Sequence, residues 1–125
     1  MATVRIETEE RDGTVIVRLI GDAGIVSGPI LEQEFTRIVA KKPPLVILDL
    51  AELAFIASLG MGSLVALHRG IAMRGGKLFM VNVREAVLTA LKRSQLDRVF
   101  AIRGTMEDVV PFRASPDANS GLAVG

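Results

Sequence analysis

The sequence contains no cysteine, no tryptophan and no tyrosine, and it has a single histidine. The lack of cysteine excludes disulfides, thiol catalysis and thiolate metal sites, and one histidine argues against a metal site built from protein ligands. The net charge is only +1, with no basic patch interleaved with aromatic side chains, which argues against nucleic-acid binding. No apolar run reaches the roughly 18 residues of a membrane span, and the N-terminus lacks the apolar core of a signal peptide. We therefore predict a cytoplasmic protein with no cofactor, no metal and no direct membrane insertion.

What the chain does have is a large apolar fraction, since half of its 125 residues are hydrophobic. This length suits one compact domain and is too short for two ordinary ones. The core must be built mainly from aliphatic side chains, as in a small sheet covered by helices. From Ala114 onward the periodicity disappears and small and polar residues dominate. We therefore expect one domain over residues 1–113 and a disordered tail over residues 114–125.

The spacing of apolar residues alternates between the period of strands and that of helices. Strands are predicted over residues 3–9, 15–20, 45–50, 77–83 and 99–102. Helices are predicted over residues 27–41, 58–74, 84–94 and 105–113. The first two strands flank an Asp-Gly turn signal and predict a hairpin, while the continuous apolar runs of the next two predict buried parallel strands. The predicted fold is α/β, with a small mixed β-sheet (an amino-terminal hairpin plus parallel strands) covered by about four helices.

Ser58 lies where the middle of the chain changes from strand to helix. As an N-cap, its side-chain oxygen would accept a hydrogen bond from a backbone N–H one turn into the helix. Alternatively, it could accept a phosphoryl group, because the free N–H groups and the dipole of a helix N-terminus attract anions. A phosphate adds up to about two negative charges and can abolish docking without unfolding the protein. Without an adjacent base, Ser58 is a poor nucleophile, so we expect a regulated or bound site and no catalysis.

A strip of small and apolar residues follows Ser58 on the outer face of the same predicted helix. The strip consists of Leu59, Gly62, Ala66, Gly70 and Met73, with Arg69 as the charge beside it. Such a surface can receive a partner protein, or it can be covered by the loops or tail of this chain. The predicted partner-binding residues are Ala57, Ser58, Leu59, Met61, Gly62, Ala66, Arg69 and Met73.

Other residues with possible chemistry receive structural interpretations. The Gly-Met-Gly at residues 60–62 opens a helix, as dinucleotide loops do, but Val65 stands where the third glycine would be. His68 has no acid or nucleophile near it in the sequence, and Asp49 suits the capping of a turn. A small enzyme or nucleotide-binding protein is the alternative from another class. It would need an acid–base pair near Ser58, and the sequence supplies none there.

The middle of the chain resembles the STAS domain, the fold of bacterial anti-sigma factor antagonists and of the cytoplasmic tails of sulfate transporters. The resemblance runs from about Val4 to Val110, and two segments carry it: VILDLAELAFIASLGMGSL and RGGKLFMVNVREAVLTALKRSQLDRVFAI. The second segment looks like the family's GG-x-L-x-x-x-N, followed by a helix and an L-D-x-x-F ending.

This resemblance implies a role in signal transduction and transcription regulation through protein–protein interaction. In antagonists of this family, an anti-sigma factor serine kinase phosphorylates a serine at the strand-to-helix junction. The unphosphorylated form binds that kinase and frees the sigma factor, and a metal-dependent phosphatase resets the cycle. The partners implied for this chain are therefore such a kinase and such a phosphatase.

The junction departs from the family's usual D-S-S-G motif at two positions. Ala57 stands in place of the acidic residue and Leu59 in place of the usual phosphoacceptor, while Ser58 keeps the first serine. Because leucine cannot be phosphorylated, the resemblance makes Ser58 the phosphorylation candidate, as in scaffold-type relatives of the family. The alternative is a binder without a switch, such as a STAS subunit of a transporter or of a signalling scaffold.

Overall fold

The structure is a computed structural model that describes residues 3–106 and Val109. Its strands are β1 (Val4–Arg11), β2 (Thr14–Ala23), β3 (Leu45–Asp49), β4 (Leu53–Ile56), β5 (Lys77–Val81) and β6 (Ala101–Arg103). Within the described residues the α-helices are α1 (Gly28–Ala40), α2 (Ser58–Met73) and α3 (Glu85–Arg93). Two short 3₁₀ helices, η1 (Ile25–Ser27) and η2 (Leu96–Arg98), precede α1 and follow α3.

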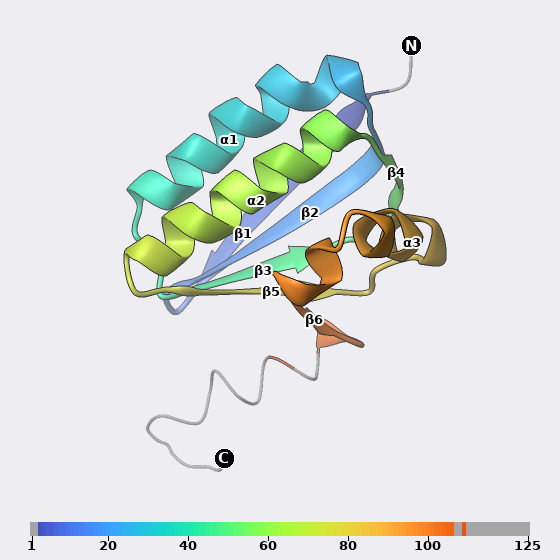
Figure 1. Cartoon of the computed structure of the whole chain (residues 1–125). Coiled ribbons are helices and arrows are strands. Elements are labelled where there is room, and N and C mark those ends of the chain that lie inside the picture. Colours follow the sequence, from blue (N-terminus) through green and yellow to red (C-terminus); the bar gives the residue numbers. More distant parts are fainter. Residues whose placement is uncertain (1–2, 107–108, 110–125) are drawn as a thin grey trace.

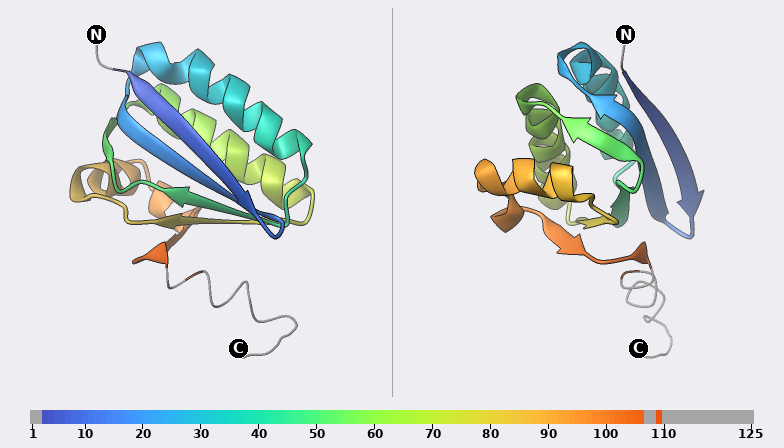
Figure 2. Two further views of the ribbon diagram at one scale, coloured as in Figure 1. Left: turned by 180° about the vertical axis from the view of Figure 1, so that it is seen from behind. Right: turned by 90° about the vertical axis from the view of Figure 1, so that its right-hand side faces the viewer.

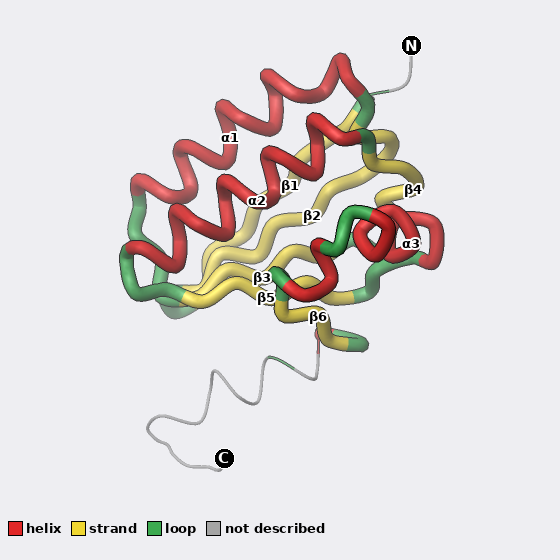
Figure 3. Tube along the Cα trace, in the orientation of Figure 1, coloured by secondary structure: helices red, strands yellow, loops and turns green. Residues whose placement is uncertain are grey.

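The strands form one mixed six-stranded sheet in the order β1-β2-β3-β5-β6, with β4 paired to β2 outside this path. β1 and β2 form the antiparallel hairpin, and the remaining pairs are parallel. β3 and β4 pair with the same strand in succession, because Arg18 of β2 pairs with Asp49 and Gly21 pairs with Leu53. Figure 3 shows the short β4 leading into the start of α2.

The helices α1 and α2 lie side by side across one face of the sheet, and α3 lies beside β4 (Figures 1 and 2). The main core fills the space between these helices and the strands. It includes the buried residues Leu31, Phe35 and Ile38 of α1, Leu64, Leu67 and Ile71 of α2, and Val87 and Leu91 of α3. Burial of these aliphatic side chains is the dominant favourable term in folding and fixes the positions of the helices over the sheet.

The opposite face of the sheet carries a smaller apolar cluster beside a row of charges. The cluster consists of Ile16, Leu45, Ile47, Phe79, Val81 and Val109. Arg18 lies 3.6 Å from a carboxylate oxygen of Glu9 and 3.4 Å from one of Asp49, so the row crosses three strands. The Arg11 guanidinium donates a hydrogen bond to Glu9 and lowers the pKa of that carboxyl. This face therefore differs in character from the face that carries the helices.

The predicted fold class is confirmed, with three corrections. The described residues contain three α-helices instead of about four, and the fourth, expected over residues 105–113, lies mostly outside the described residues. β4 was not predicted, because a strand of four residues with a register shift in its pairing has too little periodicity to be recognised. The last strand begins at Ala101 and not at Val99, because the Val99 N–H closes a turn on the Leu96 carbonyl at 2.9 Å. The expected tail over residues 114–125 lies outside the described residues.

The helices and the acidic and histidine side chains of the described residues bear on membrane insertion and on metal binding. None of the helices in this part is long and apolar enough to cross a membrane. Over the same residues, no group of three or more histidine, aspartate or glutamate side chains is placed to hold a metal ion.

Candidate functional site

The start of α2 is held against the end of β2 by backbone contacts. The Ala57 N–H donates to the Ala23 carbonyl at 2.8 Å, and the Ala57 carbonyl accepts from the Met61 N–H at 3.0 Å. Ala57 is therefore the N-cap, and Ser58 is the first residue of the helix. The prediction that Ser58 caps the helix is wrong, because the pairing of Ala57 with Ala23 sets the helix boundary one residue earlier. Ala57 has no polar side chain and makes no side-chain capping hydrogen bond to the first turn.

Ser58 itself is exposed at this corner of the molecule. Within the described residues its hydroxyl has no hydrogen-bond partner. The first turn of α2 also carries no acidic side chain, so its N–H groups and dipole are not offset by a charge on the same helix. The hydroxyl is thus accessible and lies beside backbone groups that favour an anion.

Exposed apolar side chains gather around the same corner. They come from η1, from the first turn of α1 and from the first turn of α2; η1 contacts both helices, and the two helices contact each other. We call them the junction patch, which consists of Val26, Ile30 and Leu59. Val26 is 55% exposed and Leu59 is 57% exposed. A contiguous apolar patch of this kind marks an interaction surface.

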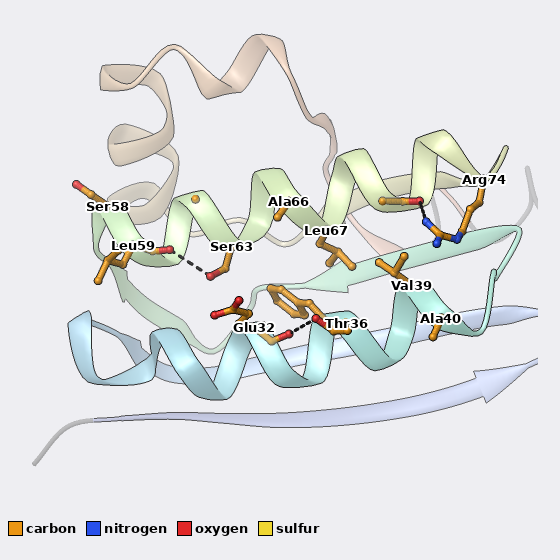
Figure 4. A pocket seen from close by; sticks show the side chains of 13 residues that line it. Glu32, Thr36, Val39, Ala40, Ser58, Leu59, Ser63, Ala66, Leu67 and Arg74 are labelled. Carbon is orange, nitrogen blue, oxygen red and sulfur yellow. Dashed lines mark hydrogen bonds between the residues drawn. The ribbon is translucent and has the colours of Figure 1, made fainter.

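A groove of about 600 Å³ runs from the junction patch along the seam between α1 and α2 (Figure 4). The groove is lined by Glu32, Phe35, Thr36, Val39, Ala40, Ser58, Leu59, Gly62, Ser63, Ala66, Leu67, Gly70 and Arg74. In Figure 4 the Leu59 side chain points toward α1, whereas the Ser58 side chain points away from it. The Ser63 hydroxyl donates to the Leu59 carbonyl at 3.2 Å, and the Thr36 hydroxyl donates to the Glu32 carbonyl at 2.8 Å.

The strip predicted on α2 does not form one continuous surface. Leu59, Gly62 and Ala66 line the groove and lie within reach of a partner. Gly70 is a packing residue, because a Cβ built on it would lie 2.8 Å from Cγ2 of Val39 on α1. Met73, which is 82% exposed, does not line the groove. The carboxy-terminal part of the predicted strip therefore divides into a helix–helix contact and a separate exposed side chain.

Two other predicted contact residues lie away from the groove. Arg69 is exposed on α2 but does not line it. Met61 is half-buried and packs against the main core, so only part of its side chain is available to a partner. Of the two glycines around Met61, Gly60 packs closely, with an ideal Cβ 3.1 Å from the Ala23 carbonyl oxygen, while one on Gly62 would meet nothing within 4 Å.

Asp49 and His68, which were interpreted from the sequence as structural residues, both make contacts that stabilise the fold. One Asp49 oxygen, Oδ1, accepts from the Ala51 N–H and from the Asn82 side-chain amide, each at 3.1 Å. His68 is half-buried and packs edge-to-face on Phe100, with the ring centroids 5.6 Å apart. Neither residue lines the groove at Ser58, where the described residues provide no histidine or lysine to act as a base.

The α1 side of the site was missed by reasoning from the sequence. Glu32, Thr36 and Ala40 form part of this wall, and none of them was a predicted contact residue. The sequence does contain a signal, since both helices carry small residues in their second halves. That signal can be used only when α1 is known to lie beside α2.

Comparison with known proteins places this arrangement in a family. Residues 5–109, most of the chain, match the STAS domain. The crystal structure of an anti-sigma factor antagonist from Mycobacterium paratuberculosis is similar, with a TM-score of 0.78 and 27% sequence identity over 86% of this chain and 91% of that chain. The phosphorylated form of the Bacillus cell fate determinant SpoIIAA has a TM-score of 0.66 at 18% identity, over 85% of this chain and 96% of that chain.

The same fold occurs in a sulfate transporter family protein from Wolinella succinogenes. That structure has a TM-score of 0.71 at 17% identity and covers 83% of this chain and 87% of that chain. These proteins thus share the overall fold of this chain. The chain belongs to the STAS domain family, a non-enzymatic regulatory family, and resembles its anti-sigma factor antagonists.

Proposed function

We propose that this chain is a cytoplasmic regulatory protein that docks an anti-sigma factor serine kinase through the start of α2. In this proposal the kinase phosphorylates Ser58, and a phosphatase removes the phosphate. The observation that carries the proposal is an exposed serine hydroxyl, without a partner among the described residues, at the first position of a helix. The junction patch begins at the neighbouring residue Leu59 and provides apolar surface that a partner can cover.

The local structure is compatible with a phosphate on Ser58. The first N–H groups of α2 have no side-chain acceptor at the N-cap, and its first turn has no acidic residue to repel an anion. Nothing lies within 4 Å of a Cβ placed on Gly62, so the approach one turn further along the helix is open. The phosphorylated protein should therefore keep the fold.

The phosphate would act through hydration and charge at the junction patch. A phosphoserine carries up to about two negative charges, and burying it against apolar side chains is costly. Leu59, at the family's usual acceptor position, cannot be modified, and its exposure suits a direct contact with the partner. The proposed phosphorylation site, Ser58, is thus one residue before the family's usual acceptor position and lies at the rim of the contact surface.

The proposal is tested by mass and by binding. Intact-mass analysis with fragmentation, on protein from its own cells, should find a phosphate on Ser58. In binding to the purified kinase, Ser58→Asp should weaken affinity by about tenfold or more, while Ser58→Ala should bind normally because the hydroxyl makes no contact within the described residues.

The matched control is Thr89→Asp, which adds the same charge to an exposed position on α3 that does not line the groove. This control should leave the affinity unchanged. If Ser58→Asp and Thr89→Asp bind equally well and no phosphate is found in any growth condition, the switch is excluded. The chain would then be a non-switching STAS subunit that joins a transporter or a signalling scaffold by docking.

A further inference from the structure

The groove between α1 and α2 has one charge of each sign at its two ends. Glu32 lies near the start of both helices, and Arg74 follows the end of α2. Neither has an ion-pair partner within the described residues, and Arg74 makes only a long contact of 3.5 Å with the Gly70 carbonyl. The other lining residues carry no charge. The two charges are therefore free to pair with a molecule that occupies the groove.

The two helices that form the groove run in the same direction. α1 leads from β2 to its parallel neighbour β3, and α2 leads from β4, which is parallel to β2, to β5, which is parallel to β3, so both helices run opposite to these strands. The positive ends of both helix dipoles lie at the Glu32 end of the groove, and the negative ends lie at the Arg74 end. A third helix in the groove is favoured by these dipoles only when it runs antiparallel to α1 and α2.

We propose that the groove receives one amphipathic helix of the partner protein, antiparallel to α1 and α2. An acidic side chain in the first turn of that helix pairs with Arg74, and a basic side chain in its last turn pairs with Glu32. This inference rests on the proposed docking function, because the groove opens at Leu59 in the junction patch. An isolated helix itself favours this order of charges, so the partner sequence can be stable as a helix and complementary to the groove.

The dimensions of the groove fix the spacing of the partner's residues. Glu32 lies across from Ser63 in Figure 4, and Ser63 precedes Arg74 by about 11 residues, or roughly 16 Å of helix. The partner's charged residues should therefore lie about three turns apart on one face. Apolar residues at intervals of three and four between them would pack against Val39 and Ala66.

Ser58 lines the groove only at its Leu59 end, and its side chain points away from α1, so a phosphate there would not lie in the space between the two helices (Figure 4). Helix binding in the groove and regulation at Ser58 can therefore be separated experimentally.

The probe is a synthetic helical peptide of about 18 residues, built on alanine with leucine along one face. One version carries glutamate in its first turn and lysine in its last turn, and a twin carries the two charges exchanged. Titration followed by amide NMR resonances should show the first version binding about tenfold more tightly than the twin, with shifts at groove residues. In the double variant Glu32→Lys/Arg74→Glu, which keeps the net charge, the preference should reverse.

The matched control is Glu52→Lys/Arg69→Glu, which also keeps the net charge but alters exposed residues outside the groove. This control should bind both peptides as the native protein does. Equal affinity for the two peptides, shifts confined to other surfaces, or no binding at about millimolar peptide would each overturn the inference.

Failure of this inference is distinguishable from failure of the proposed function. Ser58→Asp should lower affinity for the kinase, whereas the preference between the two peptides, which depends on Glu32 and Arg74, should persist. If the kinase binds and responds to Ser58→Asp but the peptides do not bind, the proposed function stands and the helix inference is wrong. If the peptides bind with the predicted polarity but the kinase does not, the groove is a helix site of a different partner.

Discussion

An ideal Cβ on Gly62, near the start of α2, would meet no atom within 4 Å, whereas one on Gly70 would lie 2.8 Å from Cγ2 of Val39. The two glycines are eight residues apart on the same helix, and the sequence places them in the same apolar strip. In the first half of α2 the small residue leaves a surface open to a partner. In the second half it allows α1 and α2 to approach closely. The comparison shows that small residues at similar spacing can leave one end of a helix open to a partner and allow the other end to pack closely against a neighbouring helix.

The largest expected effect comes from filling the packed end. Gly70→Leu should lower the free energy of unfolding by about 2 kcal/mol, because the new side chain overlaps Val39 and must displace α1. Urea unfolding followed by circular dichroism measures this change. A variant as stable as the native protein would show that the two helices have room to separate, and the contrast between the two halves would disappear.

Filling the open end should have the opposite effect on stability. Gly62→Arg should raise the free energy of unfolding by up to about 1 kcal/mol, because arginine favours the helix more than glycine and meets no atom there. The same variant should block docking of the kinase, as measured by calorimetry. A large drop in melting temperature would instead identify Gly62 as a packing residue.

The unusual N-cap offers a smaller effect at the open end. Ala57→Asp should stabilise the protein by roughly 0.5–1 kcal/mol, because aspartate can accept a hydrogen bond from the first turn and alanine cannot. Thermal unfolding at neutral pH measures the gain. No gain would mean that the new carboxylate does not accept a hydrogen bond from the helix N–H groups.

The smallest effect is expected at Ser58. Ser58→Ala should change the free energy of unfolding by less than about 0.5 kcal/mol, since an exposed side chain without a hydrogen bond contributes little. A loss near 1 kcal/mol in the free energy of unfolding, measured by chemical denaturation, would indicate that the Ser58 side chain does cap the helix. Ser58 would then be a structural residue and not part of the accessible surface in the first half of α2.

Much of the fold could be predicted because its signals are local. The inward stripe of α2, Gly60, Leu64, Leu67 and Ile71, is buried as its spacing indicates. Gly75, which follows the end of this helix, has a φ of 82°, a conformation that glycine commonly adopts there. Alternation and continuous apolar runs likewise gave the hairpin and the central strands. These features follow from periodicity and turn chemistry, which a single sequence contains.

The parts of the site that were missed depend on contacts distant in sequence. The helix boundary at Ala57 is set by its hydrogen bond to Ala23, which no rule about cap residues contains. The split of the strip at Gly70 depends on Val39, which lies on another helix. The wall with Glu32 likewise exists only because α1 packs beside α2. The sequence thus led to Ser58 and Leu59 but not to the groove that continues from them.

The succession of β3 and β4 along one edge of β2 has a consequence for how the protein opens and closes. β2 is paired with β1 on one side from Thr14 to Gly21, and with β3 and then β4 on the other side. Because successive amide groups of a strand point to opposite sides, complete exchange of β2 requires β1 to detach on one side and both β3 and β4 to detach on the other. Amide hydrogen exchange in β2 should therefore report global unfolding, and this strand should be the slowest part of the molecule to acquire deuterium.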